Sequence, residues 1–147
     1  MNGTEQKGLH TGLLLLRIGL GIMMVIHGSL KFAGGEEALT WTGSAVSIFG
    51  FSSGHMFFGI IAAMIEIIGG LLLALGFFHK LAALALLLVM IMASIYEINA
   101  NTGFSDTFVK ASHPVKIGIV YLSLIITGPG KYSLDNRIFN KKQKKTK

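Results

Sequence analysis

Four stretches of this chain are apolar over about the length that a membrane-crossing helix requires, which is ~20 residues. They are about Thr11 to Ala33, His55 to Phe78, Leu81 to Ile98, and His113 to Thr127. Glycine, proline or polar residues interrupt the chain after each stretch, at Gly34-Gly35, His79-Lys80, 99–112 and Gly128-Pro129-Gly130. The pattern predicts an all-α membrane protein whose fold is a four-helix transmembrane bundle.

The stretch between the first two crossings, residues 36–54, has apolar positions that are too sparse for a further crossing. Tryptophan is typical of the membrane edge, and this stretch contains Trp41. We therefore expect an interfacial or re-entrant segment between helices 1 and 2 that caps the bundle. The polar stretch 99–112 is expected to form a loop on the same side, with Pro114 in the first turn of the fourth helix.

Composition supports a membrane protein with a single domain. The chain has 147 residues, of which 52% are hydrophobic, and its mean hydropathy is +0.64. It contains no cysteine, which excludes dithiol chemistry, thiolate-bound clusters and disulfides. Any redox chemistry would therefore need a bound cofactor or a separate subunit. Because Arg17 interrupts the first apolar run, we interpret that run as a retained helix and not as a signal peptide.

The net charge of +6 comes largely from the end of the chain, because seven of the thirteen lysines and arginines follow Gly130. This placement favours a basic tail, residues 136–147, next to a membrane domain of residues 1–135, and not a nucleic-acid surface. Lys7 and Lys80 fall on the same side as this tail, whereas Glu36, Glu37 and Asp106 fall on the other. The excess of lysine predicts a multi-pass protein with cytoplasmic N and C termini.

Charged side chains inside the crossings need partners within the protein, since exposing a charge to lipid is costly. On the first helix Arg17, His27 and Lys31 share about one third of the circumference. Glu66 lies near the centre of the second crossing, too far from either interface to reach water. We therefore predict a structural ion pair of Arg17 with Glu66. An alternative for Arg17 is that its side chain extends to the cytoplasmic interface.

Several polar side chains are expected to converge toward the outer side of the bundle. They are His27, Lys31, Glu97, His113 and Lys116. Together with Glu66 they are the candidates for a catalytic role, although whether the protein catalyses a reaction stays open. Such a cavity suits an apolar molecule with a polar head, and a quinone is the candidate cofactor. A metal site is not predicted, because the methionines are better explained as adaptable packing.

Each candidate also has a structural interpretation. Lys31 and Lys116 could extend outward to the interface, and Glu97 could mark a helix end in contact with water. A single histidine in a helix, such as His27 or His113, is more often a hydrogen-bonded packing residue than a catalyst. For Glu66 we favour a function or an essential ion pair, because it has no path to solvent.

Four motifs in this order resemble the DoxX family of small four-helix membrane proteins. They are LLRIGLG, HGSLK, EIIGGLLLALG and GPGKYSLD, beginning at Leu15, His27, Glu66 and Gly128. The resemblance implies a bundle in the cytoplasmic (inner) membrane of a bacterium, linked to respiratory oxidoreductases. Related DoxD proteins are subunits of a thiosulfate:quinone oxidoreductase, and some DoxX members associate with redox-defence enzymes. More distant animal relatives look like chaperones for membrane receptors, so the resemblance alone leaves the activity open.

Two functions from different classes follow. In the first, the chain is a quinone-interacting subunit of a membrane oxidoreductase, and His27, Lys31 and Lys116 bind the headgroup. In the second, it is a non-catalytic assembly protein that docks a redox enzyme or another membrane protein. A haem protein, with His27 and His113 as axial ligands, is a third and more distant alternative.

Overall fold

The computed structural model describes residues 2–100 and 103–138, and within these ranges every regular element is helical. The elements are α1 (Gly3–Ala33), α2 (Gly35–Gly43), the 3-10 helix η1 (Ser44–Phe49), α3 (His55–Leu75), α4 (His79–Ala100) and α5 (Phe104–Thr127). Helices α1, α3, α4 and α5 are long and apolar enough to cross a membrane. The predicted fold class, a four-helix transmembrane protein, is confirmed. Residues 139–147 of the predicted basic tail lie outside the described residues.

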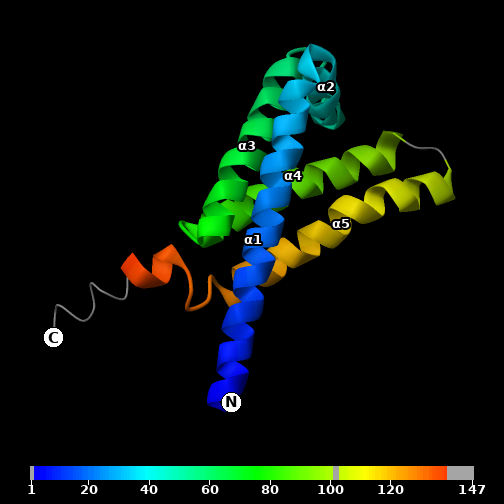
Figure 1. The fold of residues 1–147 in the computed structure, drawn as a ribbon. Helices are drawn as coiled ribbons and strands as arrows, with labels where there is room; N and C mark the ends of the chain where they lie inside the picture. The colour runs from blue at the N-terminus through cyan, green and yellow to red at the C-terminus, as the bar shows by residue number, and fades with distance from the viewer. Residues whose placement is uncertain (1, 101–102, 139–147) are drawn as a thin grey trace.

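The four long helices form two antiparallel pairs, α1 with α3 and α4 with α5 (Figure 1). The pairs approach each other around the start of α4 and diverge toward the end that carries α2. A buried cluster from all four helices joins them: Met24, Leu73, Ala82, Ala83, Leu86, Met90, Tyr121 and Leu124. A cavity lined by residues of both pairs lies on the α2 side of this core.

Glycines set the register between α1 and α3. A Cβ atom on Gly21 would lie 2.5 Å from the carbonyl oxygen of Gly70, and one on Gly28 would lie 2.7 Å from that of Ala63. Small residues allow this approach, in which the backbones of two membrane helices are in contact. Any larger side chain at these positions would separate the helices, so the level of each α1 residue against α3 is fixed.

The segment between the first two crossings is helical and folds back onto the start of α3. Its contact is also a glycine crossing, because a Cβ on Gly59 would lie 1.8 Å from the carbonyl oxygen of Leu39. At its outer side the ring of Trp41 packs edge-on against Tyr96 of α4, with 5.9 Å between ring centroids. The expected capping segment therefore spans from α3 to α4.

Two helix starts differ from the sequence prediction. Helix α1 begins at Gly3, because the Asn2 N–H donates to the Glu5 carboxylate at 2.8 Å and caps a turn that we had assigned to a polar lead-in. Helix α5 begins at Phe104, so most of the predicted loop 99–112 is helix and Pro114 lies in its interior. Asp106 favours this earlier start, since an acidic side chain in the first turn complements the helix dipole.

The chain after α5 folds against the start of α4 and closes one end of the protein. The Asp135 carboxylate accepts the backbone N–H groups of Phe78 and His79, each at 2.9 Å, and so caps the beginning of α4. The fully buried Arg17 donates to the carbonyl oxygen of Tyr132 at 3.0 Å. Gly76 is required beside it, because a Cβ there would lie 1.7 Å from Arg17 Nη1. We call these four groups, Arg17, Gly76, Tyr132 and Asp135, the arginine clamp.

The predicted ion pair of Arg17 with Glu66 is wrong, because the salt bridge of Glu66 is made with Lys31. The register of α1 against α3 explains why Arg17 cannot reach Glu66. Gly28 lies beside Glu66, with 3.1 Å between an added Cβ and the Glu66 Cβ. Arg17 is eleven residues earlier on the same helix, or about 16 Å along its axis. Lys31 is less than one turn from Gly28 and reaches Glu66 instead.

The arginine clamp generates a stability prediction. Asp135→Ala removes the acceptor of two N–H groups and a negative charge near the buried Arg17, so it should destabilise the protein by about 1–2 kcal/mol. The melting temperature of the purified protein in mild detergent measures the effect. Arg137→Ala, an exposed position in the same segment, is the matched control and should change little. Equal melting temperatures for the two variants would contradict the assigned role of Asp135.

Candidate functional site

An ion pair in the middle of the helix bundle is the centre of the candidate site. Lys31 Nζ of α1 lies 2.5 Å from Glu66 Oε1 of α3. The Glu66 side chain is 1% exposed and that of Lys31 is 18% exposed. Glu66 Oε2 is also buried and accepts no hydrogen bond from the described residues. An ammonium group has three N–H donors, so the pair offers both donors and an acceptor to a neighbouring molecule.

The pair borders a cavity of about 390 Å³ between the two helix pairs, which we call the histidine cavity. The histidines and the charged residues in its lining are His27, Lys31, Glu66, Glu97, Lys110 and His113. Its apolar lining residues include Leu20, Met23, Met24, Met90 and Ile117. Such a combination of an apolar wall with a few polar groups is typical of small-molecule sites.

Two histidines face each other across the space between the pairs. The ring of His27 on α1 stacks with that of His113 on α5, with 6.5 Å between centroids and 18° between planes. Trp41 and Tyr96 also line the cavity. Within the described residues no group of three or more histidines and acidic residues could hold a metal ion.

The structure brings together most of the predicted outer cluster. His27, Lys31, Glu66, Glu97 and His113 all line the histidine cavity. Lys116 is not among the residues that line this cavity, and it is exposed. At about 100° per residue it lies about 160° around α5 from Pro114, which faces the cavity.

One lining residue was missed by the sequence analysis. Lys110 precedes the predicted start of the fourth helix and was therefore assigned to a loop. Because α5 begins at Phe104, Lys110 lies one turn before His113 and Pro114 and shares their cavity. The signal that could have revealed it is the i, i+3, i+4 spacing of these three residues.

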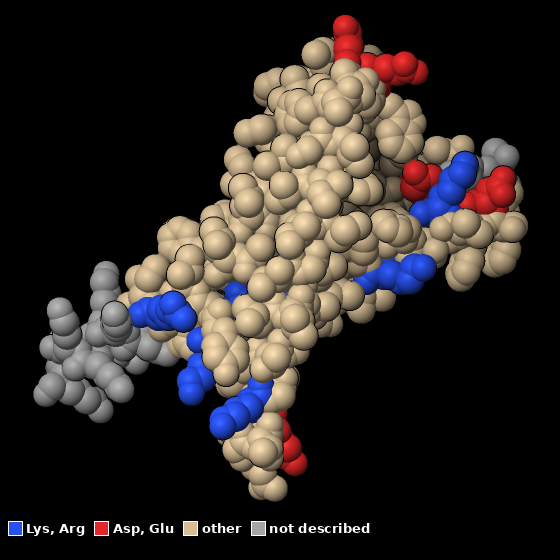
Figure 2. Space-filling view, in the orientation of Figure 1, with Lys and Arg blue, Asp and Glu red and all other residues tan. Residues whose placement is uncertain are grey.

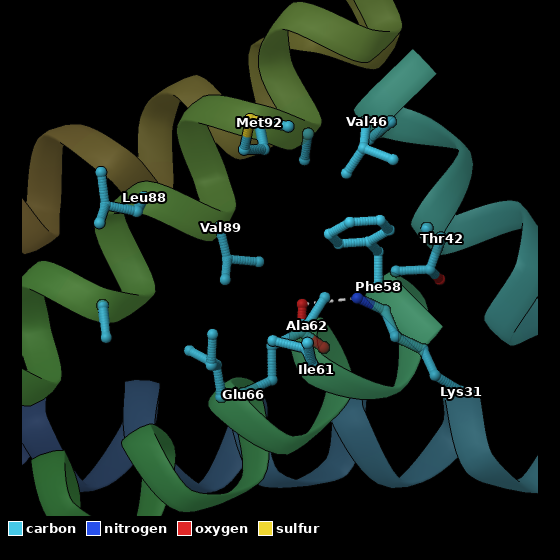
Figure 3. Close-up of a pocket in the computed structure, with 15 residues that line it drawn as sticks. Lys31, Thr42, Val46, Phe58, Ile61, Ala62, Glu66, Leu88, Val89 and Met92 are labelled. Carbon is cyan, nitrogen blue, oxygen red and sulfur yellow. Dashed lines mark hydrogen bonds and ion pairs between the residues drawn. The ribbon is translucent and has the colours of Figure 1, made fainter. Parts of the chain in front are cut away.

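A second cavity of about 290 Å³ lies on the other side of the ion pair, between α2, η1, α3 and α4. We call it the apolar cavity, since its wall consists mainly of aliphatic and aromatic side chains. Figure 3 shows Val46, Phe58, Leu88, Val89 and Met92 around it, with the Lys31–Glu66 contact at its edge. Lys31 and Glu66 therefore belong to the walls of both cavities.

Comparison with known proteins identifies the family to which the sequence is similar. The family model of DoxX matches residues 12–96, which include Arg17, Lys31, Glu66 and Gly76. No solved structure matches the chain.

Two relatives match over nearly the whole chain. A protein of Haemophilus influenzae, named only "Uncharacterized protein", is 30% identical over 133 residues, which cover 88% of this chain and 92% of the relative. A Bacillus subtilis protein named "Putative oxidoreductase CatD" is 29% identical over 137 residues, which cover 93% and 94%. Because the family model covers more than half of its length, the chain belongs to the DoxX family.

Proposed function

We propose that this DoxX protein binds a quinone at the Lys31–Glu66 pair, as a membrane subunit of an oxidoreductase system. The observation that supports this most directly is a buried ion pair with an unused acceptor, Glu66 Oε2, at the border of a largely apolar cavity. A bilayer-soluble molecule with a small polar head fits that combination.

The chemistry of the pair suits both forms of a quinone. The carbonyl oxygens of the oxidised form accept hydrogen bonds, which Lys31 and His27 can donate. The hydroxyl groups of the reduced form donate hydrogen bonds, which Glu66 Oε2 can accept. An imidazole ring can both donate and accept a proton, so His27 and His113 are suited to exchange the protons that accompany the redox change. Glu97 would orient the head or take part in this exchange.

The capping segment forms part of the cavity wall. Trp41 and Tyr96 both line the cavity and pack against each other, which joins the capping segment to α4. Under this proposal the Trp41 segment closes the outer end of the site. Lys116 receives no role, because the cavity-facing side of α5 carries Lys110 and His113 instead.

The redox assignment draws on two further facts. One relative carries the name "Putative oxidoreductase CatD", and this chain has no cysteine with which to accept electrons. Electrons would therefore pass between the quinone and a partner enzyme or a cofactor of that partner. The competing function, assembly of another membrane protein without quinone binding, is an outcome of the test below.

The proposed location is the cytoplasmic membrane of a bacterium, with both termini in the cytoplasm. In Figure 2 several lysine and arginine side chains lie toward the end of the protein that carries the start of α1, acidic side chains lie at the α2 end, and the far end of the α4–α5 pair carries side chains of both signs. The basic residues of the first group include Lys7, Lys80, Lys131 and Arg137, and the acidic residues at the α2 end include Glu36 and Glu37. An excess of lysine and arginine on one side favours the cytoplasm for that side.

The orientation is tested by reporter fusions. Fusions at Lys80 and at the C terminus should report a cytoplasmic location, and fusions near Glu37 and Asp106 an external one. A cytoplasmic signal from the Glu37 position would overturn the proposed topology.

The Lys31–Glu66 pair is tested by a double-mutant cycle. Lys31→Leu leaves a buried carboxylate without its partner, and the cost in such sites is about 3–5 kcal/mol. The double variant Lys31→Leu/Glu66→Leu should be less destabilised than either single variant. The matched control combines Arg17→Leu with Glu66→Leu, and its effects should add, because these residues belong to different sites. The free energy of unfolding in detergent is the measurement, and additive effects for the Lys31 pair would contradict the coupling.

Quinone binding is tested by thermal stability in detergent. A ligand that binds the folded state alone should raise the melting temperature of the wild type, across a panel of ubiquinone, menaquinone and their analogues. His27→Leu should abolish the shift while the protein still folds, since His27 is exposed to the cavity and supports no buried pair. Lys116→Leu, on the opposite side of α5, is the control, and in this variant the quinone should still raise the melting temperature. If no quinone changes the melting temperature of the wild type and a membrane protein copurifies stoichiometrically, the assembly function would replace this proposal.

A further inference from the structure

The two cavities are not separate pockets at distant places, because they share part of their walls. Five residues line both: Lys31, Thr42, Ala45, Glu66 and Ala93. Two of the five are alanines and one is threonine, so the border between the cavities is formed by small side chains and the ion pair. A flexible chain attached to a head at Lys31–Glu66 would have a route from one cavity into the other.

The polar groups are distributed unevenly between the two cavities. The histidine cavity carries two histidines, Glu97 and Lys110 in addition to the ion pair. Among the residues that line the apolar cavity, Lys31, Thr42 and Glu66 are the ones with a polar side chain, and all three lie at the shared border. Beyond this border the wall is aliphatic and aromatic, for example Val46, Phe58 and Leu88 (Figure 3). A molecule that fills both spaces must therefore have its polar part at the border or in the histidine cavity.

We infer that the apolar cavity binds the isoprenoid tail of the quinone, so that the ligand of this protein is a tailed quinone whose head contacts Lys31 and Glu66. This inference rests on the proposed function. Tail binding by apolar side chains supplies affinity through burial, and the ion pair supplies orientation. In this arrangement the apolar cavity holds the tail, and the head lies at the ion pair on the border of the histidine cavity.

The capping segment would then contact both ends of the ligand. Trp41 of α2 lines the histidine cavity, Val46 of η1 lines the apolar cavity, and Thr42 and Ala45 between them line both. A tailed ligand would therefore be enclosed along the whole segment from Trp41 to Val46, whereas a tailless head would contact one half of it. Discrimination between ligands should consequently depend on the tail as well as on the head.

The test compares one headgroup with and without a tail. The ubiquinone headgroup alone, and the same headgroup carrying one or two isoprene units, are titrated against the protein in detergent while the melting temperature is followed. The ligand concentration at half-maximal shift should fall at least about tenfold when the tail is added, because apolar surface is buried. Equal half-maximal concentrations for tailed and tailless ligands would overturn the inference.

A variant separates specific tail binding from partition of the ligand into the micelle. Ala62 is half-buried and lines the apolar cavity but not the histidine cavity, so Ala62→Phe fills the tail site alone. In this variant the advantage of the tailed ligand should fall at least about tenfold, while the tailless head binds as before. Met64→Phe, two residues further on α3 and outside both cavities, is the matched control and should behave as the wild type. If Ala62→Phe fails to fold, Leu88→Trp from α4 fills the same cavity.

The possible outcomes distinguish the two claims. If no quinone of any tail length raises the melting temperature, the proposed function itself fails. If tailed and tailless quinones both bind and Ala62→Phe leaves the advantage of the tail unchanged, quinone binding stands and the tail site is wrong. The second result would also follow if a lipid chain fills the apolar cavity.

Discussion

The close antiparallel packing of α1 on α3 is the constraint on which the polar chemistry of this protein depends. Gly21 and Gly28 bring the α1 backbone against Gly70 and Ala63, and no larger residue fits between them. This fixed register places Lys31 at the level of Glu66 and leaves Arg17 at the arginine clamp. The buried Arg17 and the partly buried Lys31 therefore each have a partner of their own, as a low-dielectric surrounding requires.

The arginine clamp holds one end of the protein closed, and this allows the cavities to form at the other end. Asp135 caps α4, and Tyr132 of the same segment binds Arg17 of α1, so the C-terminal segment ties the two helix pairs together at one end. With that end closed, the pairs can diverge at the other end without separating (Figure 1). The space between them is the histidine cavity, and the ion pair lies where the divergence begins.

The sequence pattern predicted the four crossings, the helix end at Gly34-Gly35 and the need of Glu66 for a partner, because hydropathy and burial of charge act locally. The pattern failed to predict features that depend on how the helices pack against one another. A helical wheel gives the direction of Arg17 and Lys31 but not their level against α3, which the glycine contacts determine. The start of α5 was missed because its first turns are polar, and this error assigned Lys110 to a loop and put Lys116 in the site.

Stability alone is a weak explanation for the Lys31–Glu66 pair. Replacing a buried ion pair by apolar residues of similar volume is often neutral or stabilising, so a bundle of this kind does not need such a pair to fold. Arg17, by contrast, binds a backbone carbonyl group in a segment that closes the fold. Glu66 keeps one oxygen without a hydrogen bond from the described residues, between two cavities that share it as a wall. A group placed in this way is better suited to a ligand than to packing, which is why we assign the site to this pair and not to the clamp.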